Sequence, residues 1–163
     1  MKTLVALVLL SIVVPTALSQ NTPGAGTFGL SVSFSGIVGN NVVTMSNGLG
    51  GVYWVDNHWV ISGGLGLSSI ADVATTFTFS AGGRYHFNKN TLSPLVAAAM
   101  FLNVISPSGA GAKSTTQFGF LLGGGAEYFV SKSLGTTVFQ GLQFSTEPTT
   151  FAFVTRFGLE WYF

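Results

Sequence analysis

The sequence contains no cysteine and few charged residues, and each scarcity excludes a class of protein. Because none of its 163 residues is Cys, the chain can form no disulfide bond, and its stability must come from packing and hydrogen bonds. Charged residues make up only 7% of the chain, whereas a soluble domain carries about 25%. So few charges cannot cover a surface that faces water on all sides.

Long hydrophobic runs are also scarce, and the longest one lies at the beginning of the chain. Residues 4–14 are apolar at every position but one and follow a basic residue. This run is too short for a transmembrane helix, which needs roughly 20 residues. The small residues Ala17 and Ser19 precede a cleavage position, as in a secretory signal peptide. We therefore predict a cleaved signal peptide over residues 1–19 and a single domain over residues 20–163.

The charges that remain in the predicted domain are balanced. Removal of the signal peptide takes away Lys2 and leaves equal numbers of basic and acidic residues. A neutral domain without basic clusters does not attract nucleic acid electrostatically, so nucleic acid is not an expected partner.

Residues 151–163 alternate regularly between two kinds of side chain. One set is Phe151, Phe153, Thr155, Phe157, Leu159, Trp161 and Phe163, and the interleaved set is Ala152, Val154, Arg156, Gly158, Glu160 and Tyr162. Alternation with a period of two predicts a strand with two different faces. Aromatic residues at the ends of the apolar face are typical of a transmembrane strand, whose polar face points into a barrel. An ordinary edge strand at the end of a soluble chain is the alternative.

This stretch resembles the closing strand of bacterial outer-membrane β-barrels, which ends in Phe. The segments 83–90 and 123–134 likewise resemble hairpin ends of the OmpA-like and opacity-type family of small outer-membrane barrels. The resemblance covers the whole mature chain and depends on alternation, glycine and aromatic residues rather than on a catalytic motif. It implies that the barrel-assembly machinery recognises the last strand during biogenesis. The residues implied in that recognition are Phe157, Leu159, Trp161 and Phe163.

Alternation of the same kind divides the mature chain into eight strands. Their predicted bounds are 26–35, 47–55, 59–67, 75–87, 91–103, 115–130, 134–145 and 151–163. Tight turns are predicted at 56–58, 88–90 and 131–133, and a short connection at 147–149. We therefore predict an all-β fold, an eight-stranded antiparallel up-and-down transmembrane β-barrel with its short turns in the periplasm. The 22 Gly residues suit the interior of a narrow barrel.

Two structural alternatives compete with this reading. Pro94 cannot donate a ladder hydrogen bond, so residues 95–102 could instead form a helix. The whole chain could also be a soluble lipid-carrying barrel of the lipocalin type, with apolar residues inside and charged residues outside. The shortage of charged residues and the terminal Phe163 argue against that inverted barrel.

Four charged residues share the parity of the inward faces, and they are Arg84, Glu127, Arg156 and Glu160. A lipid-facing Arg near the middle of the membrane would cost about 2–4 kcal/mol, so an inward position is also the favourable one. We interpret the four as a neutral salt-bridge network that fills the lumen. A transport pathway is the alternative.

The sequence offers no convincing catalytic or metal site. The match to G-x-G-x-x-G at residues 24–29 follows no strand and opens no helix, so it is not a nucleotide-binding motif. His58 and His86 are the two histidines, and two isolated imidazoles without cysteine do not make a metal centre. We therefore expect no enzyme, no metal and no cofactor.

These observations predict an integral protein of the outer membrane of a Gram-negative bacterium, with a structural or surface-loop interaction role. The interior of an eight-stranded barrel is just wide enough to be filled by side chains, which favours a plugged lumen. A narrow porin-like channel or small-ligand conduit is the alternative. The expected partners are outer-membrane lipid and, during biogenesis, the barrel-assembly machinery, and the expected state is a monomer.

Overall fold

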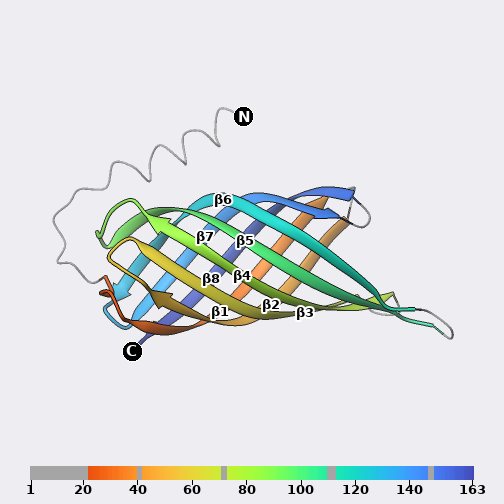
Figure 1. The fold of residues 1–163 in the computed structure, drawn as a ribbon, viewed down its shortest axis with the longest axis horizontal. Coiled ribbons are helices and arrows are strands. Elements are labelled where there is room, and N and C mark those ends of the chain that lie inside the picture. The colour runs from red at the N-terminus through yellow and green to blue at the C-terminus, as the bar shows by residue number, and fades with distance from the viewer. Residues whose placement is uncertain (1–21, 40–41, 71–72, 110–112, 147–148) are drawn as a thin grey trace.

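The computed structural model describes residues 22–39, 42–70, 73–109, 113–146 and 149–163. They form eight strands, each hydrogen-bonded to the next along the chain, and the last strand pairs with the first to close a barrel (Figure 1). The strands are β1 (Phe28–Gly39), β2 (Val42–Trp54), β3 (Trp59–Ile70), β4 (Ala74–His86), β5 (Leu92–Pro107), β6 (Thr115–Ser131), β7 (Leu134–Thr146) and β8 (Thr149–Tyr162). The predicted eight-stranded antiparallel up-and-down barrel is confirmed. Among the described residues no helix is long and apolar enough to cross a membrane.

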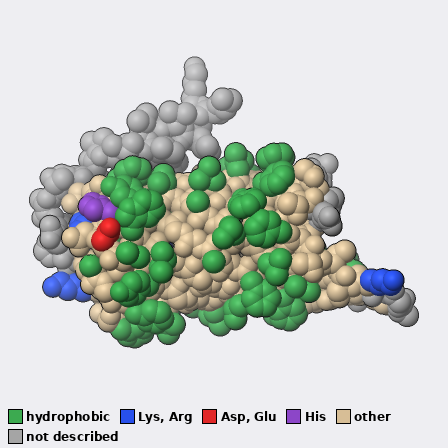
Figure 2. All heavy atoms as spheres, in the orientation of Figure 1, with side chains coloured by type: hydrophobic (Ala, Val, Ile, Leu, Met, Phe, Trp, Pro, Cys, Tyr) green, Lys and Arg blue, Asp and Glu red, His purple; other side chains and the backbone are tan. Residues whose placement is uncertain are grey.

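Side-chain parity separates the barrel into an apolar outside and a packed inside. The neighbours Leu121 and Leu122 in β6 are 6% and 67% exposed, although they are the same kind of residue. Large hydrophobic side chains lie on the outer surface of every strand, and in the face shown in Figure 2 they gather toward the two ends of the barrel. An outer surface of this kind suits lipid, with bulky side chains near the two membrane interfaces.

The three predicted tight turns lie at one end of the barrel, and each is held by a side-chain oxygen. In every case that oxygen accepts a hydrogen bond from the backbone N–H two residues further on, as is usual for Asx and Ser turns. The acceptor and donor pairs are Asp56 with His58 at 2.6 Å, Asn88 with Asn90 at 3.1 Å and Ser131 with Ser133 at 3.2 Å. The backbone N–H groups of His58 and Trp59 also lower the pKa of Asp56 below its ordinary value. We call this end of the barrel the turn end, and the C-terminus lies beside it (Figure 1).

At the opposite end, the loop end, several strands are longer than predicted. β1 continues to Gly39 instead of ending at residue 35, and β2 begins at Val42 instead of residue 47. The reason is that apolar residues follow one another without alternation in this hairpin. The sequence pattern that marks a strand therefore ends before the hydrogen-bonded pairing of β1 with β2 ends. β5 and β6, with 16 and 17 residues, are the longest strands and project past the rest of the barrel at the loop end (Figure 1).

The helical alternative for residues 95–102 is wrong, because this segment is an inner part of β5. Pro94 fits into the strand because of its place in the ladder. Its carbonyl oxygen accepts a hydrogen bond from Phe87 N–H at 3.0 Å, and β4 ends one residue earlier, at His86. A backbone N–H at position 94 would point toward Phe87, which lies beyond the end of β4. Its absence in proline therefore removes no hydrogen bond between paired strands. The predicted signal peptide and positions 147 and 148 of the predicted connection lie outside the described residues.

Candidate functional site

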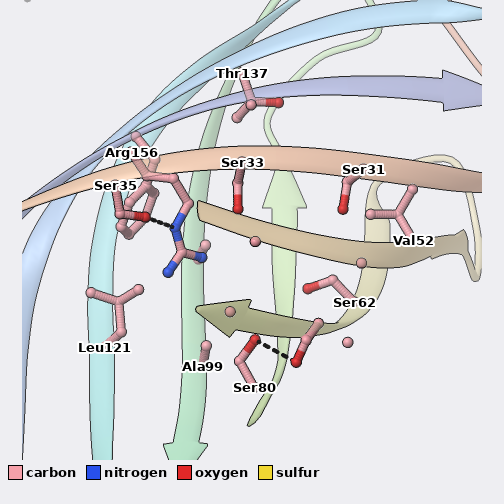
Figure 3. A pocket seen from close by; sticks show the side chains of 18 of the residues that line it. Ser31, Ser33, Ser35, Val52, Ser62, Ser80, Ala99, Leu121, Thr137 and Arg156 are labelled. Carbon is pink, nitrogen blue, oxygen red and sulfur yellow. Dashed lines mark hydrogen bonds between the residues drawn. The ribbon is translucent and has the colours of Figure 1, made fainter. Parts of the chain in front are cut away.

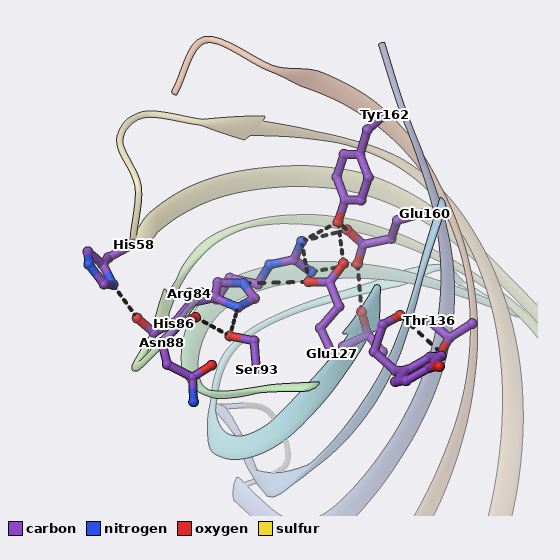
Figure 4. Close-up of polar contacts among 11 residues, drawn as sticks. His58, Arg84, His86, Asn88, Ser93, Glu127, Thr136, Glu160 and Tyr162 are labelled. Carbon is purple, nitrogen blue, oxygen red and sulfur yellow. Dashed lines mark hydrogen bonds and ion pairs between the residues drawn. The ribbon is translucent and has the colours of Figure 1, made fainter. Parts of the chain in front are cut away.

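Three of the predicted inward charges meet inside the barrel near the turn end. β4 supplies Arg84, β6 supplies Glu127 and β8 supplies Glu160, and all three side chains are buried. Nη1 and Nη2 of Arg84 donate to Oε1 and Oε2 of Glu160, both at 2.5 Å (Figure 4). Nη2 also lies 3.3 Å from Oε2 of Glu127. The bidentate pair with Glu160 is the stronger geometry, because two parallel charge-assisted hydrogen bonds hold both groups in one plane.

Two hydroxyl groups complete this ion cluster. The Tyr162 hydroxyl lies between the two carboxylates: it is 2.7 Å from Oε2 of Glu160 and also makes a very short contact with Oε1 of Glu127. A phenol has one proton to donate, so the two carboxylates compete for it. Thr137 of β7 donates from Oγ1 to Oε1 of Glu160 at 3.0 Å. Four strands, β4 and β6 to β8, therefore contribute to one polar network.

A layer of aromatic side chains lies on the turn side of the ion cluster. The rings of Trp54 and His86 are 4.8 Å apart, and Phe129 and Tyr162 surround Trp54 at 6.1 and 6.4 Å. The Ser93 hydroxyl donates to the Asn88 carbonyl at 2.7 Å, so its oxygen accepts from Nδ1 of His86 at 2.9 Å. This assigns the proton of the imidazole to Nδ1 and leaves Nε2 facing Glu127 at 3.5 Å.

We call these residues together the closed-end cluster. They are Trp54, Arg84, His86, Glu127, Phe129, Glu160 and Tyr162, and each is less than 9% exposed. Charged and aromatic side chains are packed together here inside the barrel, whose eight-stranded interior is just wide enough for side chains.

Between the closed-end cluster and the loop end the lumen is not filled. A cavity of about 160 Å³ lies there, and Arg84 and Glu160 are among the residues that line it. Its two walls differ, because the lining residues of β1 to β4 are mainly small and hydroxyl residues whereas those of β5 to β7 are mainly apolar. The hydroxyl wall includes Ser31, Ser33, Ser35, Ser62 and Ser80, and the apolar wall includes Leu95, Ala97, Ala99, Leu121 and Phe139.

The fourth predicted network residue, Arg156, lies apart from the other three. It projects into the cavity, where its Nε donates to Oγ of Ser35 at 3.1 Å (Figure 3). Its position is four residues from Glu160 along β8, or about 13 Å at the rise of a strand. No carboxylate of the described residues forms an ion pair with it. The prediction of one four-residue network therefore does not extend to Arg156.

Tyr162 is the main residue that sequence reasoning missed. Tyr162 has the same parity as Glu160 along the last strand, which predicts an inward side chain. This pattern could have added Tyr162 to the predicted salt-bridge network. His86 was predicted to be isolated, but it contacts Ser93 and Glu127. The part of the chain that the structure describes contains no group of three or more His, Cys, Asp or Glu that could hold a metal ion.

The residues implied in barrel assembly all point outward, three of them from β8 and Phe163 from the position directly after it. Phe157, Trp161 and Phe163 are 44%, 42% and 76% exposed, and Leu159 is half-buried. β8 pairs with β7 on one side and β1 on the other, and the Phe163 N–H donates to Phe28 O at 2.8 Å.

Comparison with known proteins identifies a family and a shared fold. The family described as "Putative MetA-pathway of phenol degradation" matches over residues 13–160. The N-terminal β-barrel domain of Pseudomonas aeruginosa OprF is 13% identical, with a TM-score of 0.65 over 85% of this chain and 99% of that domain. Neisserial surface protein A is 12% identical, with a TM-score of 0.68 over 84% of this chain and 96% of that protein.

A third similar structure is that of an enzyme. The outer membrane enzyme PagL is 14% identical, with a TM-score of 0.51 over 80% of this chain and 98% of that chain. Identities this low establish the fold and no activity. No curated protein sequence matches the chain.

Proposed function

The chain belongs to the family described as "Putative MetA-pathway of phenol degradation", and we propose that it is a non-conducting outer-membrane barrel that anchors its loop end at the cell surface. The closed-end cluster is the observation that carries this proposal. Its buried side chains come from β2, β4, β6 and β8, so it ties opposite sides of the barrel together. A barrel braced in this way is a rigid support for the segments at the loop end.

The proposed location follows from the surface and from the fold. Proteins of similar structure, OprF and neisserial surface protein A among them, have the same eight-stranded architecture, and the apolar outer surface suits a lipid environment. In such barrels the short turns face the periplasm and the longer connections face outward. The projecting β5–β6 hairpin would then be the part of this monomer that meets an external partner.

A small-ligand conduit is the second candidate, and the lumen cavity favours it. Phenol, which the family's description mentions, is a small aromatic molecule. A cavity of about 160 Å³ is large enough for one such ring, because a cavity of about 150 Å³ accommodates benzene. For passage through the barrel, however, the closed-end cluster would have to move.

Single-channel recording in planar bilayers separates the two candidates. We expect no steady conductance from the wild-type protein, and openings from Trp54→Ala, because Trp54 is 1% exposed at the centre of the aromatic layer. Trp59→Ala is the matched control, since Trp59 also lies at the turn end but points outward at 52% exposure. Steady, reproducible conductance from the wild-type protein would favour the conduit.

We also propose that the barrel-assembly machinery recognises the outward residues at the end of the chain, which are Phe157, Leu159, Trp161 and Phe163. Phe163→Ala keeps the backbone hydrogen bond to Phe28, so its expected effect on stability after refolding in detergent is within about 0.5 kcal/mol. In cells, the same variant is expected to lower the fraction of folded, heat-modifiable protein severalfold. Phe151→Ala, 68% exposed at the other end of β8, is the control. Equal losses from both variants in cells would argue against terminal recognition.

A further inference from the structure

Arg156 is a cation inside the lumen without an acidic partner among the described residues. Its Nε donates to Ser35, and its guanidinium points into the cavity toward Leu121 and Ala99 (Figure 3). Arg156 is half-buried, and a charge partly removed from bulk water is unfavourable unless an opposite charge or several hydrogen bonds compensate it. A guanidinium has five N–H donors, and one neutral hydroxyl leaves most of them without a hydrogen-bond acceptor.

The acidic groups of the lumen cannot supply the missing anion, because they are already engaged. Both oxygens of Glu160 accept hydrogen bonds from Arg84, and Tyr162 and Thr137 donate to them as well. The oxygens of Glu127 face Arg84, Tyr162 and His86. An anion that pairs with Arg156 must therefore come from outside the described chain, and the filled turn end leaves the loop end as its route of entry.

The walls of the cavity indicate what kind of anion fits. Ser35, which accepts from Arg156, and Ser33 contribute hydroxyl groups to the lining, whereas Leu121 and Phe139, the partner of Arg156 in the β7–β8 pairing, contribute apolar surface. The volume of about 160 Å³ is close to that of a cavity of about 150 Å³ that accommodates benzene. An inorganic anion would leave the apolar wall without a partner, and a neutral hydrocarbon would leave the guanidinium without one.

We propose that the lumen cavity is a binding site for a small organic anion. Its carboxylate pairs with Arg156 and the neighbouring serine hydroxyls, and its apolar body, about one ring in size, packs against Leu121 and Phe139. This site does not require passage through the barrel. Binding and conductance are separate measurements, so an absence of current does not affect the proposal.

Calorimetric titration of the folded protein in a non-ionic detergent tests the site with three probes. Benzoate carries both features, benzamide has the ring without the charge, and acetate has the charge without the ring. We expect benzoate to bind at least about tenfold more tightly than either of the others, because charge-assisted hydrogen bonds and apolar burial each strengthen binding. Undetectable benzoate binding, or equal affinity for benzoate and benzamide, would overturn the proposal. This comparison needs only the wild-type protein.

Variants of Arg156 assign the binding to this side chain. Arg156→Gln is expected to weaken benzoate binding at least about tenfold and to leave benzamide binding unchanged, whereas Arg156→Lys keeps the charge and a larger part of the affinity. Lys132→Gln removes a cation from an exposed turn and is the control, with both affinities unchanged. Benzoate affinity unchanged in Arg156→Gln would contradict the assignment.

Discussion

Replacing Arg84 with Met is expected to lower the free energy of unfolding by about 3–5 kcal/mol. The variant removes the two hydrogen bonds to Glu160 at 2.5 Å and the contact with Glu127 at 3.3 Å. Both carboxylates are less than 5% exposed, so water compensates only in part for the lost guanidinium. Two buried acidic groups without a cation are far less favourable than the intact cluster.

Urea unfolding in lipid vesicles, followed by tryptophan fluorescence, measures this loss. Arg156→Met is the matched control, because it removes an inward Arg that has no carboxylate partner in the described chain, and its expected effect is within about 1 kcal/mol. Losses of equal size in the two variants would show that the ion cluster contributes nothing specific.

The charge-reversed pair Arg84→Glu with Glu160→Arg should recover part of the loss, with a coupling energy of about 0.5–3 kcal/mol. Parity predicted both Glu127 and Glu160 as inward acidic residues that could serve in such a swap. The structure favours Glu160, since that carboxylate holds the bidentate contact. Strictly additive losses would mean that the two groups do not interact.

Replacing Gly125 with Ala is expected to prevent stable closure of the barrel, at a cost of about 3 kcal/mol or more. A Cβ atom at this position would lie 2.0 Å from the Val138 carbonyl oxygen and 2.8 Å from Cα of Phe139. Both atoms belong to the backbone of β7, so no side-chain rotation relieves the overlap. β6 and β7 approach each other this closely because the inward position 125 has no side chain.

Gly63→Ala is the matched control for this prediction. A Cβ atom at Gly63 would lie 3.7 Å from the Ser80 carbonyl oxygen, an ordinary van der Waals distance. Its expected effect on the free energy of unfolding is within about 0.5 kcal/mol. Heat-modifiable migration on gels reports the folded fraction, and urea unfolding reports the stability of whatever folds. A Gly125→Ala protein as stable as Gly63→Ala would show that β6 and β7 can separate without loss.

Alternation predicted the faces of the strands well, because it follows directly from the period of the pleat. The outward positions of residues 77, 79 and 157 and the inward position of Glu127 could all be read from parity. The strand ends at the loop end could not, since residues 36–39 and 42–45 lack the alternation that marks a half-buried strand.

Which inward residues meet across the lumen was harder to predict than which residues point inward. Parity gives a side chain its face, but its depth relative to another strand depends on the stagger of the barrel, which no short pattern contains. Arg84 and Glu160 lie on strands four apart, and their contact depends on that stagger. Because the stagger could not be predicted, Arg156 was also assigned to the network of Arg84, Glu127 and Glu160, although its side chain forms no ion pair with either carboxylate.

The pairing of β8 with β1 has a consequence for how the protein must be made. Ser35 and Arg156 are 121 positions apart, and Arg84 and Glu160 are 76 apart, so neither contact exists while the last strand is missing. A chain that emerges from its N-terminus would carry two open sheet edges and an unpaired Arg84 until its final residues arrive, and open edges invite aggregation. We therefore expect a chain without β8 to form no stable barrel, because closure of the sheet and burial of these contacts both depend on the last strand.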